Sequence, residues 1–195
     1  MAIQVSSSGP EVPCVPYDPR NDQMKTGATF SMCRTYRYSL WRTWDESRPY
    51  ALFIGLNPST ADESKDDPTI RRCIGFARSW GFGGLCVVNL FAYRATEPKD
   101  MMKAEDPIGP ENDRWIKRLS ADAGVIVAAW GNSGSFLGSS RTITQKIPNL
   151  TCFKLNKSGE PAHPLYQPAT ATPKRIIGFV NSYSLTSPLP REIEV

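Results

Sequence analysis

The clearest pattern in the chain is a set of short apolar runs, each ended by glycine, proline or asparagine. They cover residues 51–54 (ALFI), 85–91 (LCVVNLF) and 124–130 (GVIVAAW). Runs of this length between such residues are typical of buried strands. Because helical patterns lie between them, we expect these strands to pair in parallel.

Helical spacing follows the first two of these runs. Asp67 and Pro68 are predicted to cap and begin a helix, whose apolar residues share one face until Gly81. Pro110 opens a second helix, over roughly residues 111–121. Weaker patterns predict a helix over 135–146, a strand over 150–155 and a last helix over 174–184. The alternation predicts an α/β fold, a three-layer α/β/α sandwich with a central, mostly parallel sheet.

The length of 195 residues suggests a single domain with a substantial core. Residues 1–27 carry little periodic apolar signal, so we expect a flexible N-terminal arm followed by one domain over residues 28–195. No apolar run approaches the roughly 18 residues that a membrane helix needs. Residues 1–9 have no pattern of an export signal, which favours a cytoplasmic protein.

Cysteine and histidine are too sparse for the usual metal centres. The 5 cysteines lie far apart without a CxxC pair, and the chain has 1 histidine. This distribution predicts no zinc or iron–sulfur site and no disulfide framework. We also expect no cofactor of another kind. The net charge of +4 permits a polyanionic partner without demanding one.

Residues 29–44 are rich in aromatic and β-branched residues and predict one or two strands. Basic and aromatic side chains alternate here: Arg34, Tyr36, Arg37, Tyr38, Trp41 and Arg42. Such alternation can bind nucleic acid through phosphate contacts and base stacking. It is also typical of a half-buried edge strand protected by charges, which is the interpretation we favour.

Three polar residues stand at or just beyond the ends of successive predicted strands: Asn57, Asn89 and His163. In open α/β sheets, ligands bind at the carboxyl ends of the strands, so this shared placement predicts a site. None of the three is specific alone, and a lone histidine is more often structural than catalytic. The chain has no GxxxxGK[ST], GxSxG or HExxH motif, and a Ser–His–Asp triad built on His163 stays open without a nucleophile to name.

The motifs around these residues resemble a known family. Across residues 34–166 the chain resembles the DUF1643 family, through NPSTAD, DDPTIRRCIGFAR, NLFAYRAT and HPLY. More remotely, the same motifs resemble the uracil-DNA glycosylase superfamily. GLNPS is similar to the GxNP loop of those enzymes, VVNLFAYRAT to the strand whose asparagine reads the base, VIVAAWGNSG to their strand ending in WG or LG, and HPLY to their HPS loop.

The remote resemblance implies a role for each matching residue. Asn57 would hold the hydrolytic water, Asn89 would bond the edge of an extruded base, and His163 would face the base carbonyl. Leu165 or Tyr166 would be the wedge that enters the duplex, and Phe91 and Tyr93 are the candidates for stacking on the base. The chain has Asn57 where the most active uracil enzymes have aspartate, and HPLY lacks their serine. A modified pyrimidine is therefore at least as good a substrate candidate as uracil.

The proposed chemistry needs donors for the leaving base and a positioned water, because cleavage of an N-glycosidic bond builds charge on both sides. Asparagine is no strong general base, so Asp62 is our first choice for one, while Asp66 and Asp67 fit a loop and a helix cap. Candidates for contacts to DNA are Ser59, Arg71, Arg72, Arg94 and Lys99. The basic ones fit exposed surface charges as well.

The leading hypothesis is a monofunctional DNA glycosylase-like hydrolase that flips out and excises a non-standard base from duplex or single-stranded DNA. An alternative is a nucleic-acid or nucleotide binding protein that keeps the fold without hydrolysis. An enzyme acting on a free nucleoside or nucleotide is a third.

Overall fold

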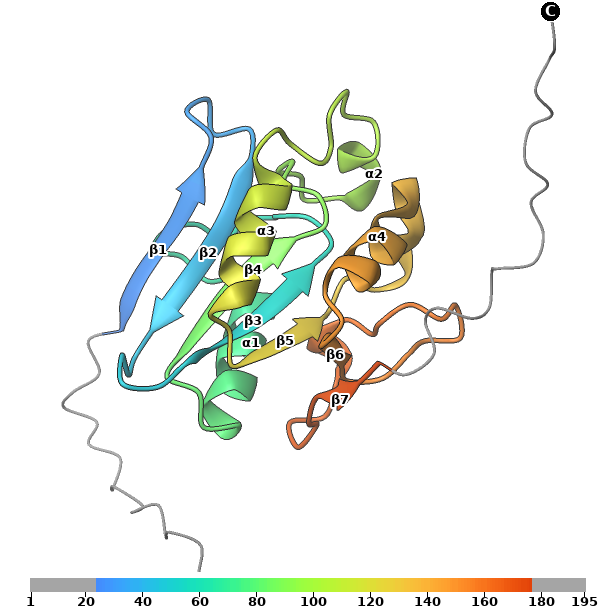
Figure 1. Cartoon of the computed structure of the whole chain (residues 1–195). Coiled ribbons are helices and arrows are strands. Elements are labelled where there is room, and N and C mark those ends of the chain that lie inside the picture. Colours follow the sequence, from blue (N-terminus) through green and yellow to red (C-terminus); the bar gives the residue numbers. More distant parts are fainter. Residues whose placement is uncertain (1–23, 177–195) are drawn as a thin grey trace, which may run out of the picture.

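The computed structural model describes residues 24–176 (Figure 1). These residues form a seven-stranded sheet in the order β1-β2-β4-β3-β5-β6-β7. The strands are β1 (Lys25–Phe30), β2 (Arg37–Thr43), β3 (Tyr50–Gly55), β4 (Gly84–Asn89), β5 (Val125–Ala128), β6 (Thr151–Cys152) and β7 (Lys174–Arg175). The helices are α1 (Pro68–Ser79), α2 (Pro98–Met101), α3 (Asn112–Ala121) and α4 (Ser139–Lys146), with 3₁₀ turns η2 (Asn132–Gly138) and η3 (Pro164–Tyr166).

The sheet is mixed, with the parallel strands at its centre. β4, β3, β5 and β6 pair in parallel, as the apolar runs predict. β2 pairs antiparallel with β4, β1 antiparallel with β2, and β7 antiparallel with β6. The expected parallel arrangement is therefore confirmed for the central strands, and the hairpin β1–β2 and the short β7 add antiparallel strands at the two edges.

Helices pack on both faces of the central strands because successive strand residues point to opposite faces. On one face the strands contribute Leu52, Ile54, Cys86 and Val88, which pack with residues of α3 and α4. On the other face they contribute Ala51, Phe53, Leu85 and Val87, which pack with α1. The protein is thus a mixed α/β fold with one apolar core on each face of its sheet.

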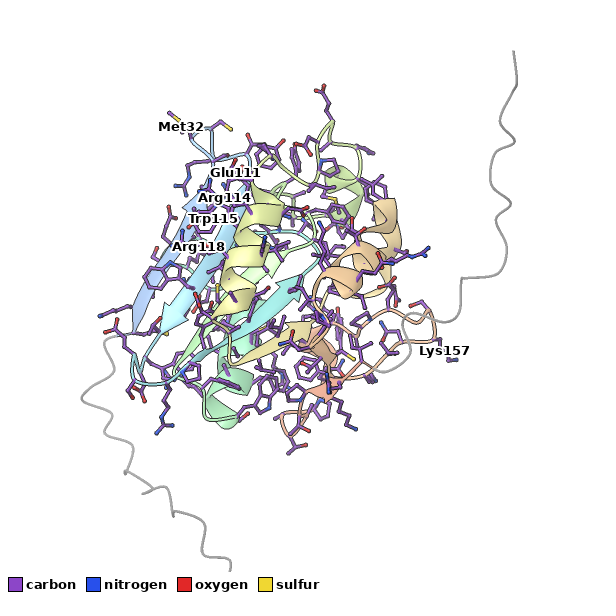
Figure 2. All side chains as sticks on the ribbon, in the orientation of Figure 1. Met32, Glu111, Arg114, Trp115, Arg118 and Lys157 are labelled. Carbon is purple, nitrogen blue, oxygen red and sulfur yellow. The ribbon has the colours of Figure 1, made fainter. Side chains whose placement is uncertain are left out.

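Helix α3 has one buried face and one face toward solvent, as a surface helix does. Asn112 and Ile116 are buried against the sheet, whereas Glu111, Arg114 and Arg118 are exposed and Trp115 is half-buried (labelled in Figure 2). Arg114 pairs with Glu111 at 3.0 Å, and the Arg118 guanidinium lies 5.6 Å from the centroid of the Trp115 ring. The polar groups of this outer face therefore satisfy one another.

The predicted start of α1 is confirmed. The Asp67 side chain accepts a hydrogen bond from the Ile70 N–H at 2.8 Å, and Pro68 occupies the first turn. Gly81 follows the helix with φ +81°, a conformation that favours glycine.

Several boundaries differ from those expected. Residues 25–27, expected in the N-terminal arm, begin β1, and the remaining arm residues up to 23 lie outside the described range. Residues 174–175 are β7 rather than the start of a helix, and residues 177–184 of that predicted helix are not described. β2 is an internal strand, since β1 covers its outer edge, so the edge-strand interpretation of its arginines is wrong. No described helix is long and apolar enough to cross a membrane.

Candidate functional site

A cavity of about 450 Å³ opens at the carboxyl ends of β3, β4 and β5. Its wall is built from the segment after β3, the N-terminus of α1, the end of β4, the residues after β5 and the segment that leads into η3. This is the sheet edge at which a ligand is expected in an open α/β fold. Asn57, Asn89 and His163 all line it, so the structure brings the three predicted polar residues together.

Asn57 is held by its amide group. Its Nδ2 donates to the carbonyl oxygens of Ala95 at 2.7 Å and Pro58 at 3.1 Å. Its Oδ1 accepts no hydrogen bond from any residue in the described range. The side chain is thus fixed in the cavity wall with one acceptor available to a ligand or a water.

Asn89 lies at the end of β4 and is 3% exposed. Its Nδ2 is buried without a partner among the residues described, an unusual state for a buried amide. Asn112 of α3 donates to the carbonyl oxygens of Asn89 (2.9 Å) and Leu90 (3.1 Å) and so fixes this turn of chain. A Cβ on Gly55 would lie 2.7 Å from Asn89 Oδ1, so glycine is needed there to leave room for the amide.

His163 presents a defined tautomer to the cavity. Its Nδ1 accepts a hydrogen bond from the Leu165 N–H at 3.3 Å, which places the proton of the neutral ring on Nε2. Burial lowers the pKa of His163 below its ordinary value, and the negative charge of Asp67 partly opposes this shift. Near neutral pH the imidazole is therefore uncharged, with Nε2–H as a donor.

The segment carrying His163 is tied to α1. Gln167 Nε2 donates to the His163 carbonyl oxygen at 3.0 Å, and the Arg72 guanidinium donates to the Gln167 carbonyl oxygen. The Arg72 guanidinium also lies 4.9 Å from the centroid of the Phe76 ring. Arg72, a candidate for phosphate contacts, is thus used to hold the histidine segment.

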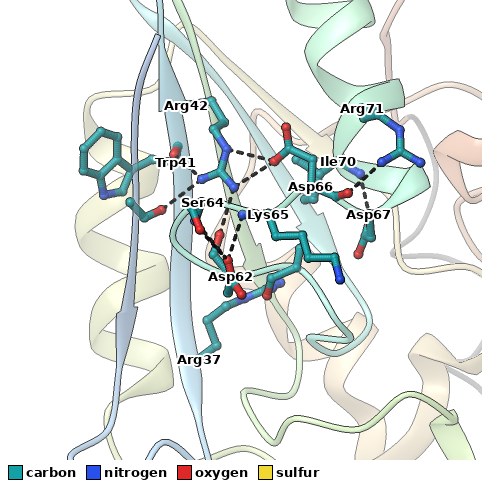
Figure 3. Close-up of polar contacts among 12 residues, drawn as sticks. Arg37, Trp41, Arg42, Asp62, Ser64, Lys65, Asp66, Asp67, Ile70 and Arg71 are labelled. Atoms are coloured by element: carbon teal, nitrogen blue, oxygen red, sulfur yellow. Dashed lines mark hydrogen bonds and ion pairs between the residues drawn. The ribbon is translucent and has the colours of Figure 1, made fainter.

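The loop between β3 and α1 is held by two arginines of β2 (Figure 3). Arg42, which is 0% exposed, pairs with Asp66 at 2.7 Å and donates to the Asp62 carbonyl oxygen at 2.8 Å. Arg37 donates to the Ala61 carbonyl oxygen at 2.7 Å. Both side chains point inward to this loop, so they form no basic face on the outer surface.

The comparisons with known proteins agree with the motifs. The family described as "protein of unknown function (DUF1643)" matches residues 37–165, which is most of the chain. The chain belongs to the DUF1643 family. No curated protein and no solved structure matches it. The DUF1643 match begins at Arg37 and ends at Leu165, which are also the first and last residues that line the cavity.

The acidic residues of this DUF1643 chain lie differently from expectation. Asp62 does not line the cavity, because its Oδ1 accepts hydrogen bonds from the N–H groups of Ser64 (2.9 Å) and Lys65 (2.7 Å) and closes its own turn. These bonds lower the pKa of the Asp62 carboxyl group. Asp67 lines the cavity instead. One of its oxygens caps α1, and the other accepts no hydrogen bond from the described residues.

The predicted stacking residues are also displaced. Phe91 is 0% exposed and packs on Phe136 with 5.5 Å between ring centroids, while the Tyr93 ring lies 6.1 Å from that of Tyr36. Neither lines the cavity. The aromatic residues that do are Phe53 and Trp130. Each sits inside an apolar strand run, so the sequence pattern assigns both to the core and gives no signal of a binding role.

Trp130 is oriented by a buried carboxylate. Its Nε1 donates to Glu160 Oε2 at 2.6 Å, and Ser140 Oγ donates to Glu160 Oε1 at 2.9 Å. Glu160 is 6% exposed. In the part of the chain that is described, no group of three or more His, Cys, Asp or Glu side chains could hold a metal ion.

The remaining DNA-contact candidates divide into two groups. Ser59 and Leu165 line the cavity, and Tyr166 is 80% exposed with its ring 5.8 Å from that of His163. Arg71 and Arg94 do not line it. Arg71 donates to the Asp66 carbonyl oxygen at 2.7 Å, and Arg94 donates to the Arg34 carbonyl oxygen at 3.1 Å.

The buried pair under the loop gives a stability prediction. Asp66→Asn removes the anionic partner of Arg42 and is expected to lower the free energy of unfolding by about 2 kcal/mol. Urea unfolding measures the change. The matched control is Glu46→Gln, which removes an exposed pair with Lys25 and is expected to cost less than about 0.5 kcal/mol. Equal losses in both variants would contradict a special role for the Arg42–Asp66 pair.

Proposed function

We propose that this DUF1643 protein hydrolyses the N-glycosidic bond of a non-standard base that has been extruded from DNA. The observation that carries the proposal is one cavity whose wall holds two donors and two acceptors suited to this reaction, none of them with a hydrogen-bond partner among the described residues. Two are donors, Asn89 Nδ2 and His163 Nε2, and two are acceptors, Asn57 Oδ1 and the free oxygen of Asp67. These are the groups that such a hydrolysis requires.

The reaction assigns each group a part. A water oxygen forms a bond to the anomeric carbon of the sugar while the bond from that carbon to the base nitrogen breaks. The electron pair of the broken bond leaves with the base. His163 Nε2–H and Asn89 Nδ2–H stabilise the negative charge that develops on the base. Asn57 Oδ1 orients the water, and Asp67 takes its proton, in place of the Asp62 suggested by the sequence.

Extrusion from DNA is supported by the surface beside the cavity. Leu165 is 38% exposed at the cavity wall, and Tyr166 beside it is 80% exposed. An apolar side chain at this place can fill the gap that a flipped base leaves in the stack. A free nucleoside would need no such residue. We also propose that the fold is a three-layer sandwich like that of the uracil-DNA glycosylases and that the protein is cytoplasmic.

A mass-spectrometric search for free bases tests the proposal. Wild-type protein is incubated with DNAs that carry different modified bases, phage DNA included, beside the Asp67→Asn variant. Release of one base by wild-type protein, and much less by the variant, is the expected result. A protein that binds DNA tightly and frees no base from any substrate is a binding protein, and the glycosylase proposal then fails.

Leu165→Ala tests the wedge. We expect it to slow base release from duplex DNA by roughly tenfold and from single strands by less than about twofold, because little unstacking is needed there. Single-turnover rates on matched oligonucleotides measure both. Leu155→Ala is the control, since Leu155 is 42% exposed and does not line the cavity. Equal slowing on both strand forms would show that Leu165 acts on the cavity alone.

A further inference from the structure

Arg37 is aimed into the cavity by an irregularity in the sheet. The register pairs Thr29 with Ser39 and then Phe30 with Arg37, so Tyr38 is an extra residue on β2. A bulge of this kind interrupts the alternation of side chains between the two faces of the sheet, so residues on either side of it are out of step. Arg37 therefore reaches the α1 face and lines the cavity together with Phe53 and Val87.

The Arg37 guanidinium is buried and mostly unsatisfied. The residue is 3% exposed, and its one hydrogen bond within residues 24–176 runs from Nη1 to the Ala61 carbonyl oxygen at 2.7 Å. Its Nε is buried without a partner. No described carboxylate lies within the 4.0 Å of an ion pair. Burial lowers the pKa of Arg37 to about 10.

Arg42, on the same strand, shows what a purely structural arginine looks like in this protein. It is 0% exposed and pairs with Asp66 at 2.7 Å. It also donates to the carbonyl oxygens of Trp41 (2.8 Å) and Asp62 (2.8 Å). The protein satisfies this buried guanidinium fully.

Arg72 and Arg94 also have a buried Nε without a partner among the described residues, but both are only half-buried and neither lines the cavity. Arg37 differs because its guanidinium is buried in the cavity wall, where its remaining donors can face a ligand.

The charges around Arg37 leave room for an anion. Asp67 and Asp62 favour its charged form from a distance, while Arg94 and Arg42 oppose it. Asp67 also lines the cavity, but one of its oxygens is bonded to the first turn of α1, whose positive end offsets its charge. A planar guanidinium binds two oxygens of a carboxylate or phosphate side by side.

We propose that the Arg37 wall of the cavity binds an anionic oxygen group of the substrate. Two sources have this chemistry: a carboxylate attached to the base, and a phosphate of the nucleotide. This inference rests on the proposed function only in treating the cavity as a base-binding site. The inference restricts the substrate to a non-standard base or nucleotide whose negatively charged group lies next to Arg37.

Calorimetric titration of the full chain with free ligands tests the inference. Uracil and thymine are compared with uracil-5-carboxylate and uracil-6-carboxylate, and uridine is compared with uridine monophosphate. We expect the anionic member of one set to bind at least about tenfold tighter than its neutral counterparts. If a uracil carboxylate binds more tightly than uracil and thymine, Arg37 binds a carboxylate of the base. If uridine monophosphate binds more tightly than uridine, Arg37 binds a phosphate.

Variants connect the preference to Arg37. Arg37→Met is expected to abolish it, and Arg37→Lys to reduce it by about threefold, because an ammonium cannot pair with two oxygens side by side. Arg48→Met is the control, since Arg48 is exposed and does not line the cavity. If Arg37→Met fails to fold, the anion preference of Arg37→Lys is compared with that of the wild type, and this comparison alone tests the role of Arg37.

The outcome is separable from that of the proposed function because no cleavage is measured. Wild-type protein that binds anionic and neutral ligands within about twofold of each other overturns the inference, whether or not it frees bases from DNA. A preference that Arg37→Lys leaves unchanged overturns it as well. A clear Arg37-dependent preference in a protein that frees no base supports the anion site and removes hydrolysis.

Discussion

Replacing His163 by alanine is expected to slow base release by about 10² to 10³-fold while weakening DNA affinity by less than about tenfold. The reason is that the Nε2–H of a neutral imidazole donates to a charge that is largest in the transition state, so its loss affects rate more than binding. Single-turnover release and affinity are measured on the same oligonucleotides. Parallel losses of rate and affinity would indicate that the 163–166 segment is only a docking surface.

The pH dependence gives an independent check on the same residue. Burial lowers the pKa of His163, so the neutral ring persists below the ordinary value of about 6.5. Protonation would put a second donor on Nδ1, against the Leu165 N–H that now donates to it. We therefore expect the wild-type rate to hold near neutral pH and to fall as the pH drops through this lowered pKa. A rate that rises on acidification would make the imidazolium the active form.

The central strands and the place of the site were predictable because they depend on simple local rules. Apolar runs such as residues 51–54 can only be buried, and helical spacing between them favours parallel pairing. The carboxyl ends of parallel strands share one edge of a sheet, so Asn57 and Asn89 had to approach each other. His163 is predicted to join this site only because of the HPLY motif in which it stands.

The chemistry of the cavity wall was less predictable because it depends on irregular backbone. Strict alternation along β2 places Arg37 on the wrong face, and nothing in the sequence reveals the extra residue Tyr38. Phe91 follows the end of β4 at Asn89, so its direction is set by the turn rather than by the strand. The loop between β3 and α1 has no period at all, which is why Asp62 and Asp67 could not be ranked.

Asp67→Asn is expected to lower base release by roughly 10²-fold or more, the scale at which loss of a general base is felt. Asparagine caps a helix about as well as aspartate, so the bond to the Ile70 N–H and the stability of α1 should be kept. What the substitution removes is the free carboxylate oxygen in the cavity, which alone can take a proton from the water held by Asn57. DNA affinity should change by less than about threefold, because neither the donors for the base nor the exposed Leu165 is altered.

Asp62→Asn is the comparison that separates the two carboxylates. Asp62 closes the turn at Ser64 and Lys65 outside the cavity, and an asparagine oxygen can accept the same N–H bonds. Its rate of base release should therefore stay close to that of the wild type, and thermal melting of both variants should stay near the wild-type curve. A large loss in Asp62→Asn together with an unaffected Asp67→Asn would return the general base to Asp62 and require the loop to rearrange when DNA binds. Equal, small effects in both would leave Asn57 to position a water that needs no protein base, as a late, dissociative transition state permits.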